Sequence, residues 1–176
     1  MTIPNLITIA RLVMVPLVIV MIGQGRWMAA FVLFVAAGVS DGIDGYIAKR
    51  FDMRSELGAY LDPLADKALL VSIYVTLSVT GALPGWLAVT VVSRDVMIVA
   101  AVILSRLMER PVAIKPLFVS KITTAAQIAF AALALGANAF GIDAPRLETA
   151  AMLAVAALTI ASAAAYLARW LRHMAA

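Results

Sequence analysis

The stretch that decides the fold is Ser40–Lys67, which reads S-D-G-I-D-G-Y-I-A-K-R-F-D-M-R-S-E-L-G-A-Y-L-D-P-L-A-D-K. It contains Asp41, Asp44, Asp62 and Asp66, beside hydrophobic runs that are long enough to cross a membrane. An ionised carboxylate in that setting is costly unless something compensates its charge. The stretch therefore predicts a ligand bound at these four residues.

Helical spacing would bring the four aspartates together in two pairs. Asp41 and Asp44 are spaced i, i+3 at the end of one predicted helix, and they share a face of it. Asp62 and Asp66 are spaced i, i+4 at the start of the next helix, and they also share a face. The connection, roughly residues 49–56, is short and polar, so we expect the helices to be antiparallel neighbours in contact. The four carboxylates can then converge.

Converging carboxylates indicate divalent cations and a phosphotransfer reaction. Carboxylates that repel one another would take up protons unless cations neutralised them, and a ligand set made of oxygen selects magnesium, manganese or calcium. Two such ions can clamp a pyrophosphate, while a partly free carboxylate accepts the proton of an attacking hydroxyl. Three small residues would let a bulky ligand or a facing backbone approach closely: Gly45, Ala48 and Gly58.

The same spacing resembles the signature of the CDP-alcohol phosphatidyltransferase family. The chain reads Asp41-x-x-Asp44-Gly45-x-x-Ala48-Lys49 and, after eight intervening residues, Gly58-x-x-x-Asp62-x-x-x-Asp66. Seven of the eight specified positions match, and the departure is Lys49, where the family has arginine. Lysine keeps the positive charge but lacks the forked geometry that binds phosphate through two hydrogen bonds. Either Lys49 or Arg50 can take the part of the family arginine.

This resemblance implies a donor, cofactors and residue roles. The donor would be a CDP-activated lipid, CMP would leave, two ions of Mg²⁺ or Mn²⁺ would be bound, and the enzyme would form a homodimer. The implied metal ligands are the four carboxylates Asp41, Asp44, Asp62 and Asp66. Asp66 would also be the general base. The residues implied to shape the nucleotide site and hold phosphate are Gly45, Ala48, Gly58 and Lys49.

Composition places the chain in a membrane. Of its 176 residues, 64% are hydrophobic and only 14% are charged, far outside the range of a soluble globular domain. A helix needs ~20 apolar residues to cross a bilayer. The chain has six apolar runs of about this length, and we expect them to form helices at about 4–22, 27–48, 58–80, 84–106, 118–139 and 147–170. We therefore predict an all-α integral membrane protein, a six-transmembrane-helix bundle of the CDP-alcohol phosphatidyltransferase type, with one domain over residues 1–176.

The basic residues indicate the orientation of this bundle. The connections after the second and fourth runs, together with the C-terminus, hold Lys49, Arg50, Arg54, Arg106, Arg110, Lys115, Arg169 and Arg172. The opposite connections hold only Arg26 and Arg146. The positive-inside rule places both termini and the aspartates at the cytoplasmic face, in a bacterial-type inner membrane. This distribution explains the net charge of +4 without nucleic-acid binding, and a chain without cysteine has no disulfide or zinc–thiolate site.

Charged residues in the later runs are candidates for contacts with substrate phosphates. Arg94 and Asp95 lie inside the fourth run, where charges often line functional cavities, although mutual neutralisation is the alternative. Lys115 and Lys121 flank the start of the fifth run and could form a basic wall for phosphate groups. Their alternative role is to extend their ammonium groups to the membrane interface.

Predictions at the two ends of the chain are less specific. Arg11 and Asn5 lie in the first run and are candidates for closing the substrate cavity from the other side. The chain after Gln127 is expected to add only helix.

The acceptor must be chosen by residues outside the signature. Two stretches are similar to the corresponding parts of the mitochondrial-type cardiolipin synthases of this family: Ser93–Ile98 and Ile114–Gln127. Phosphatidylglycerophosphate synthases usually carry Gly-Arg-Glu in place of Ser93-Arg94-Asp95. The resemblance implies that a hydroxyl of phosphatidylglycerol attacks CDP-diacylglycerol, giving cardiolipin and CMP. Glycerol 3-phosphate as acceptor is the alternative, and a small cation transporter, with aspartates lining the permeation path, is a third interpretation.

Overall fold

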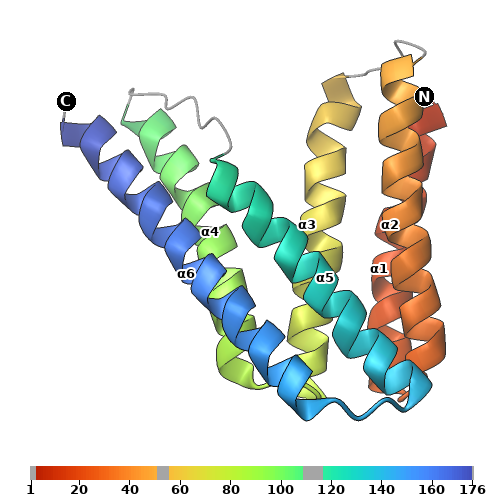
Figure 1. Cartoon of the computed structure of the whole chain (residues 1–176). Coiled ribbons are helices and arrows are strands. Elements are labelled where there is room, and N and C mark those ends of the chain that lie inside the picture. Colours follow the sequence, from red (N-terminus) through yellow and green to blue (C-terminus); the bar gives the residue numbers. More distant parts are fainter. Residues whose placement is uncertain (1–2, 51–55, 109–116, 176) are drawn as a thin grey trace. The chain divides into compact units, whose positions relative to one another are not determined.

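The computed structural model describes the backbone of residues 3–50, 56–108 and 117–175, and the side chains of residues 6–43, 64–105, 107–108 and 117–174. The described backbone contains helices and no strand (Figure 1). Its helices are α1 (Ile3–Gly23), α2 (Trp27–Arg50), α3 (Glu56–Val79), α4 (Gly85–Leu107), α5 (Phe118–Phe140) and α6 (Pro145–Ala175). The predicted all-α class is confirmed. The predicted runs match these helices to within a few residues, with α6 extending five residues further because residues 171–175 include neither glycine nor proline.

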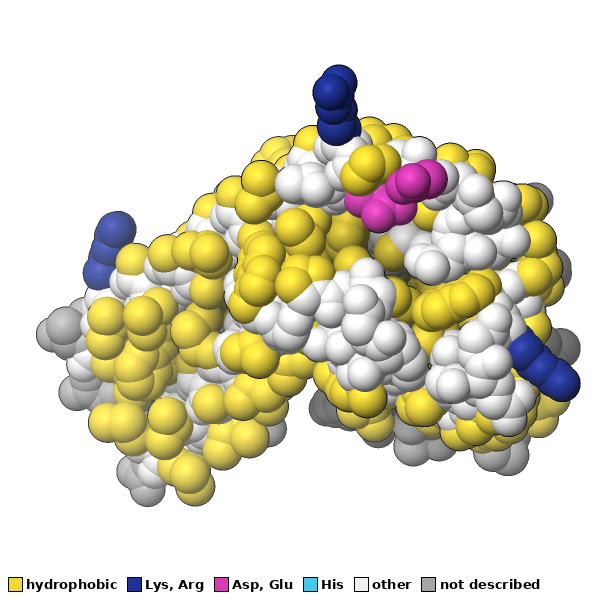
Figure 2. All heavy atoms as spheres, turned by 90° about the horizontal axis from the view of Figure 1, so that it is seen from below, with side chains coloured by type: hydrophobic (Ala, Val, Ile, Leu, Met, Phe, Trp, Pro, Cys, Tyr) yellow, Lys and Arg dark blue, Asp and Glu magenta, His cyan; other side chains and the backbone are white. Residues whose placement is uncertain are grey.

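Several of these helices have the length and composition of membrane spans. In the described residues, four apolar segments qualify: Leu6–Gly23, Gly85–Ser105, Phe118–Phe140 and Pro145–Met174. A shorter apolar segment, Trp27–Ile43, lies within α2. Figure 2 views the molecule from below the helices of Figure 1 and shows many hydrophobic and few charged side chains on that face. Large hydrophobic side chains are also exposed along the helices, among them Val13, Val89 and Leu153. The chain is therefore a multi-pass membrane protein whose apolar exterior is suited to lipid.

Glycine turns close the connections that follow α1, α3 and α5. Gly25, Gly81 and Gly141 have φ angles of 69°, 79° and 63°, in the left-handed region that glycine enters without steric cost. After α5, the amide of Ile142 donates to the carbonyl of Ala137 at 2.9 Å. Such bonds satisfy carbonyl groups that a helix end would otherwise leave without partners.

Contacts between Cα atoms divide the chain into two compact units. Unit 1 comprises residues 1–83 and 131–144, and so holds α1, α2, α3 and the second half of α5. Within it α1 packs against both α2 and α3. The start of α1, the end of α2 and the start of α3 lie at the same end of this unit (Figure 1). This arrangement brings the two halves of the aspartate signature to one place.

Unit 2 comprises residues 84–130 and 145–176, and so holds α4, the first half of α5 and α6. Within it α4 packs along α6, and its interior contains hydrogen-bonded polar side chains. Thr123 Oγ1 donates to the carbonyl of Leu158 at 3.0 Å, and Gln127 Nε2 donates to Thr159 Oγ1 at 3.1 Å. The chain after Gln127 thus contributes more than helix, since α6 supplies acceptors for buried polar groups of α5. The prediction of one domain over residues 1–176 stays a prediction.

Candidate active site

Arg11 on α1 joins two of the predicted site residues. Its Nη1 atom lies 2.7 Å from Oδ1 of Asp41 on α2 and 2.5 Å from Oδ1 of Asp66 on α3. A single guanidinium nitrogen thus bridges carboxylates from two helices. Asp41 and Asp66 converge as the sequence predicts, and they do so through α1.

The sequence of α1 explains why Arg11 faces inward. Buried residues of α1 recur every three or four positions, which places them along one stripe of the helix: Thr8, Arg11, Val15, Val18 and Ile22. A buried cation within an apolar helix requires anionic partners. The sequence made Arg11 a candidate for closing the substrate cavity and did not indicate its ion pairs with Asp41 and Asp66.

The three side chains differ sharply in exposure. The side chain of Arg11 is 1% exposed, whereas those of Asp41 and Asp66 are 45% and 50% exposed. The guanidinium group therefore lies on the buried side of the two carboxylates. Their other side is open to solvent or to a ligand.

The remaining residues of the signature occupy the predicted helices. The aspartates have the predicted helical spacing, because each pair lies within one helix. The other signature residues are divided between α2, with Asp44, Gly45, Ala48, Lys49 and the neighbouring Arg50, and α3, with Gly58 and Asp62. The side chains of all seven lie outside the described residues. The side chains that are described contain no group of three or more acidic, histidine or cysteine residues able to hold a metal ion. The metal-ligand roles of the four aspartates stay predictions.

The donor groups that are described suit a divalent cation. Asp41 and Asp66 supply carboxylate oxygens, which hard cations prefer. Both carboxylates are directed at a common positively charged group and remain half exposed. Two further aspartates occur one helical turn away in the sequence of α2 and α3, so the set has the composition required for magnesium or manganese.

Arg94 lies in the interior of unit 2 and is held by partners from three helices. Its Nη1 pairs with Oδ1 of Asp95 at 2.6 Å, and its Nη2 donates to Oγ of Ser162 at 3.0 Å and to Oγ of Ser120. The ring of Tyr166 lies 5.8 Å from the guanidinium carbon. This is the mutual neutralisation that the sequence allowed as an alternative, extended by two serines that it did not indicate. A contact between Arg94 and substrate stays a prediction.

The two lysines proposed for phosphate binding are less well defined. Lys121 is an exposed residue of α5 in unit 2. Lys115 lies outside the described residues. Their phosphate-binding roles stay predictions.

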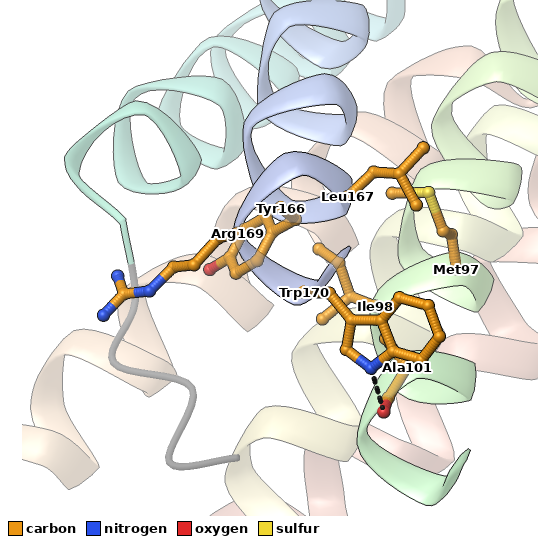
Figure 3. Close-up of a pocket in the computed structure, with 7 residues that line it drawn as sticks. All are labelled: Met97, Ile98, Ala101, Tyr166, Leu167, Arg169 and Trp170. Carbon is orange, nitrogen blue, oxygen red and sulfur yellow. Dashed lines mark hydrogen bonds between the residues drawn. The ribbon is translucent and has the colours of Figure 1, made fainter. Parts of the chain in front are cut away.

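A small cavity in unit 2 is too small to be the active site. It has a volume of about 30 Å³ and is lined mainly by apolar groups of α4 and α6, including Met97, Ile98 and Leu167 (Figure 3). One wall is fixed by Trp170, whose Nε1 donates to the carbonyl of Ala101 at 3.2 Å (Figure 3). Ligand pockets usually measure roughly 300–1,000 Å³, so this cavity is a packing void and not a substrate pocket.

Comparison with known proteins places this arrangement in a family. Residues 1–171 match the family model of CDP-alcohol phosphatidyltransferases. The chain belongs to the CDP-alcohol phosphatidyltransferase family, as the aspartate signature predicted. The match covers both units, including α4, α5 and α6, where the sequence carries no part of the signature.

Individual relatives carry two different names. The chain is 36% identical over 165 residues to a probable cardiolipin synthase (CMP-forming) of Drosophila melanogaster, covering 84% of this chain and 51% of that protein. It is 36% identical over 155 residues to the human cardiolipin synthase (CMP-forming), covering 79% and 52%. It is 34% identical over 179 residues to a probable phosphatidylglycerophosphate synthase of Mycobacterium tuberculosis, covering 97% and 82%. The chain thus spans about half the length of the two cardiolipin synthases.

Proposed function

We propose that this protein is a cardiolipin synthase of the CMP-forming kind, which transfers the phosphatidyl group of CDP-diacylglycerol to phosphatidylglycerol. The observation that carries the proposal is the convergence of Asp41 and Asp66 on Arg11. These aspartates are the first and last of the family signature, and a family member needs them in one site. The similarity to cardiolipin synthases at Ser93–Ile98 and Ile114–Gln127 supports the choice of acceptor.

A second candidate function is phosphatidylglycerophosphate synthesis from CDP-diacylglycerol and glycerol 3-phosphate. The mycobacterial relative favours it, because the alignment covers 97% of this chain and 82% of that protein. A physical difference separates the two acceptors. Phosphatidylglycerol is a lipid and needs a lateral apolar opening, whereas glycerol 3-phosphate needs a second anion-binding pocket that is open to water.

The chemistry required of the protein is the same for both acceptors. An acceptor hydroxyl oxygen forms a bond to the phosphorus of the phosphatidyl group, the bond from that phosphorus to the oxygen of CMP breaks, and CMP leaves with the electron pair. Asp66 takes the hydroxyl proton as general base. Its carboxylate suits this role because Arg11 fixes it from the buried side while half of the side chain stays exposed.

Two divalent ions, Mg²⁺ or Mn²⁺, would supply neutralisation of the pyrophosphate charge when bound. The residues that would hold them are Asp41, Asp44, Asp62 and Asp66. Gly45, Ala48 and Gly58 would leave room for the nucleotide. The basic residues that would hold phosphate groups are Lys49 or Arg50, Arg94, Lys115 and Lys121.

The proposal includes a topology. All six helices would cross the membrane, including α2 and α3, whose charged ends carry the aspartates. Both termini and the active site would then face the cytoplasm from a bacterial-type inner membrane, because the basic connections lie on that side. Membrane lipids would surround the apolar exterior, and the enzyme would act as a homodimer.

One assay tests the function and separates the two acceptors. Purified protein is given CDP-diacylglycerol with Mg²⁺ or Mn²⁺, and phosphatidylglycerol and glycerol 3-phosphate are added in separate reactions, with CMP release followed and lipid products identified by mass. We expect cardiolipin from phosphatidylglycerol. Phosphatidylglycerophosphate from glycerol 3-phosphate alone would establish the second candidate, and no CMP release with either acceptor would refute both.

A further inference from the structure

We infer that Arg11 is a positioning residue that holds Asp41 and Asp66 from the buried side while divalent ions bind them from the open side. The inference rests on the proposed function, because it takes these aspartates as metal ligands. It assigns a role in building the metal site to a residue outside the aspartate signature, on a different helix.

Arg11 and the two carboxylates compensate one another's charges. Two carboxylates that approach one nitrogen within 2.7 Å and 2.5 Å are close enough to repel one another strongly. The guanidinium group between them compensates this repulsion. In return the carboxylates compensate the cost of a cation that is almost fully buried in an apolar helix. Each charge therefore stabilises the position of the others before any metal ion is present.

The exposed side of the two carboxylates sets the direction from which a metal ion can approach. Arg11 could in principle compete with the ion for the same carboxylate oxygens, or support the carboxylates from behind. The exposures decide between these roles, since Arg11 is 1% exposed and the aspartates are 45% and 50% exposed. An ion arriving from the open side meets the carboxylates first, and it does not need to displace Nη1.

Arginine suits position 11 better than lysine would. The guanidinium group is planar, carries a delocalised positive charge, and offers several donors in a fixed fork. A lysine ammonium at the end of a flexible chain keeps the charge but does not fix the orientation of two carboxylates. Groups that orient metal ligands typically contribute about 10–100-fold to metal affinity.

The test measures Mn²⁺ binding to the purified full chain by electron paramagnetic resonance, which reports free and bound ion without any turnover. Arg11→Lys is compared with the wild type and with Arg26→Lys, a control at an exposed arginine of unit 1 in the connection between α1 and α2. We expect Arg11→Lys to weaken Mn²⁺ binding by about 10–100-fold and Arg26→Lys to leave it unchanged. Unchanged affinity in Arg11→Lys would overturn the inference. Tighter binding would also overturn it, because Arg11 would then be a competitor of the ion.

Two additions keep the test decisive. Arg11→Gln removes the buried charge but keeps a hydrogen-bond donor, so it replaces Arg11→Lys if that variant fails to fold, and the same loss of affinity is expected. Asp41→Asn shows whether the ion occupies the proposed site. If Asp41→Asn bound Mn²⁺ as tightly as the wild type does, both the metal site and the inference would be refuted. Binding that needs Asp41 but not Arg11 would refute the inference alone.

Discussion

Arg11 of α1 and Asp66 of α3 are 55 positions apart in the sequence, and their Nη1 and Oδ1 atoms are 2.5 Å apart in the structure. The same nitrogen lies 2.7 Å from Asp41 of α2. Three helices of unit 1 therefore meet at one guanidinium group, at the end of the unit where the aspartate signature lies. A change at any of these residues alters both the packing of unit 1 and the chemistry proposed for it.

Asp66→Asn should abolish most of the transferase activity while Mn²⁺ binding is partly retained. The amide cannot accept the hydroxyl proton, and loss of a general base typically costs about 10²–10⁴-fold in rate. Initial rates of CMP release, measured beside Mn²⁺ binding, check this. Asp41→Asn is the matched variant and should lose both activity and metal. Normal turnover in Asp66→Asn would rule out the general-base assignment.

Arg94→Met should destabilise unit 2, because it removes an ion-pair partner of a buried carboxylate. The side chains of Arg94 and Asp95 are 2% and 8% exposed, and breaking a buried ion pair at one side typically costs about 3–5 kcal/mol. Reversible unfolding in mixed micelles measures the change in free energy of unfolding. The double variant Arg94→Met/Asp95→Leu should recover much of the loss, since no buried charge is left behind. An Arg94→Met variant as stable as the wild type would show that the pair does not support the fold.

Gln127 and Thr159 should show a favourable coupling energy. Their side chains join α5 to α6 through a bond of 3.1 Å, and Thr159 Oγ1 also donates to the carbonyl of Val155 at 2.7 Å. Couplings of this kind within membranes average about 0.6 kcal/mol and reach about 1.7 kcal/mol. A double-mutant cycle of Gln127→Leu, Thr159→Val and the double variant measures the coupling energy, with the free energies taken from reversible unfolding in mixed micelles. Additive single effects would mean that the bond contributes no stability.

Gly136→Val should destabilise unit 1 more than Gly38→Val does. A Cβ atom at residue 136 would lie 3.3 Å from Cε2 of Phe31, whose ring packs edge-on against Phe140 at a centroid distance of 5.7 Å. The added methyl groups would displace that ring, and overpacking of this kind costs about 1–3 kcal/mol. At residue 38 a Cβ atom meets nothing within 4 Å, so the same substitution there controls for the loss of glycine. Equal effects at both positions would contradict the prediction.

Local patterns in the sequence were enough to predict the positions of the helices and part of the candidate site. Apolar runs near the length of a bilayer placed each helix to within a few residues, because a chain in lipid must satisfy its backbone hydrogen bonds within the segment. The spacing of Asp41 and Asp44, and of Asp62 and Asp66, predicted the family that the comparison with known proteins confirms. Both inferences depend on neighbours within a few residues along the chain.

The roles of two arginines depended on distant neighbours. Arg11 and Arg94 both stand within apolar runs, and the sequence could not tell whether either would meet substrate or protein. Arg94 is held by Asp95, Ser120 and Ser162, and two of these partners come from other helices. Nothing in the local pattern marks Ser162 as a partner, since a serine in an apolar helix is compatible with many surroundings.

By itself the sequence determined an all-helical membrane protein of the CDP-alcohol phosphatidyltransferase family, with a set of four aspartates at the ends of two consecutive helices. Only the tertiary structure decided that Arg11 of α1 lies behind Asp41 and Asp66. The physical reason is that helix formation follows from local hydrogen bonds and apolar periodicity, whereas the partner of a buried charge depends on how separate helices pack.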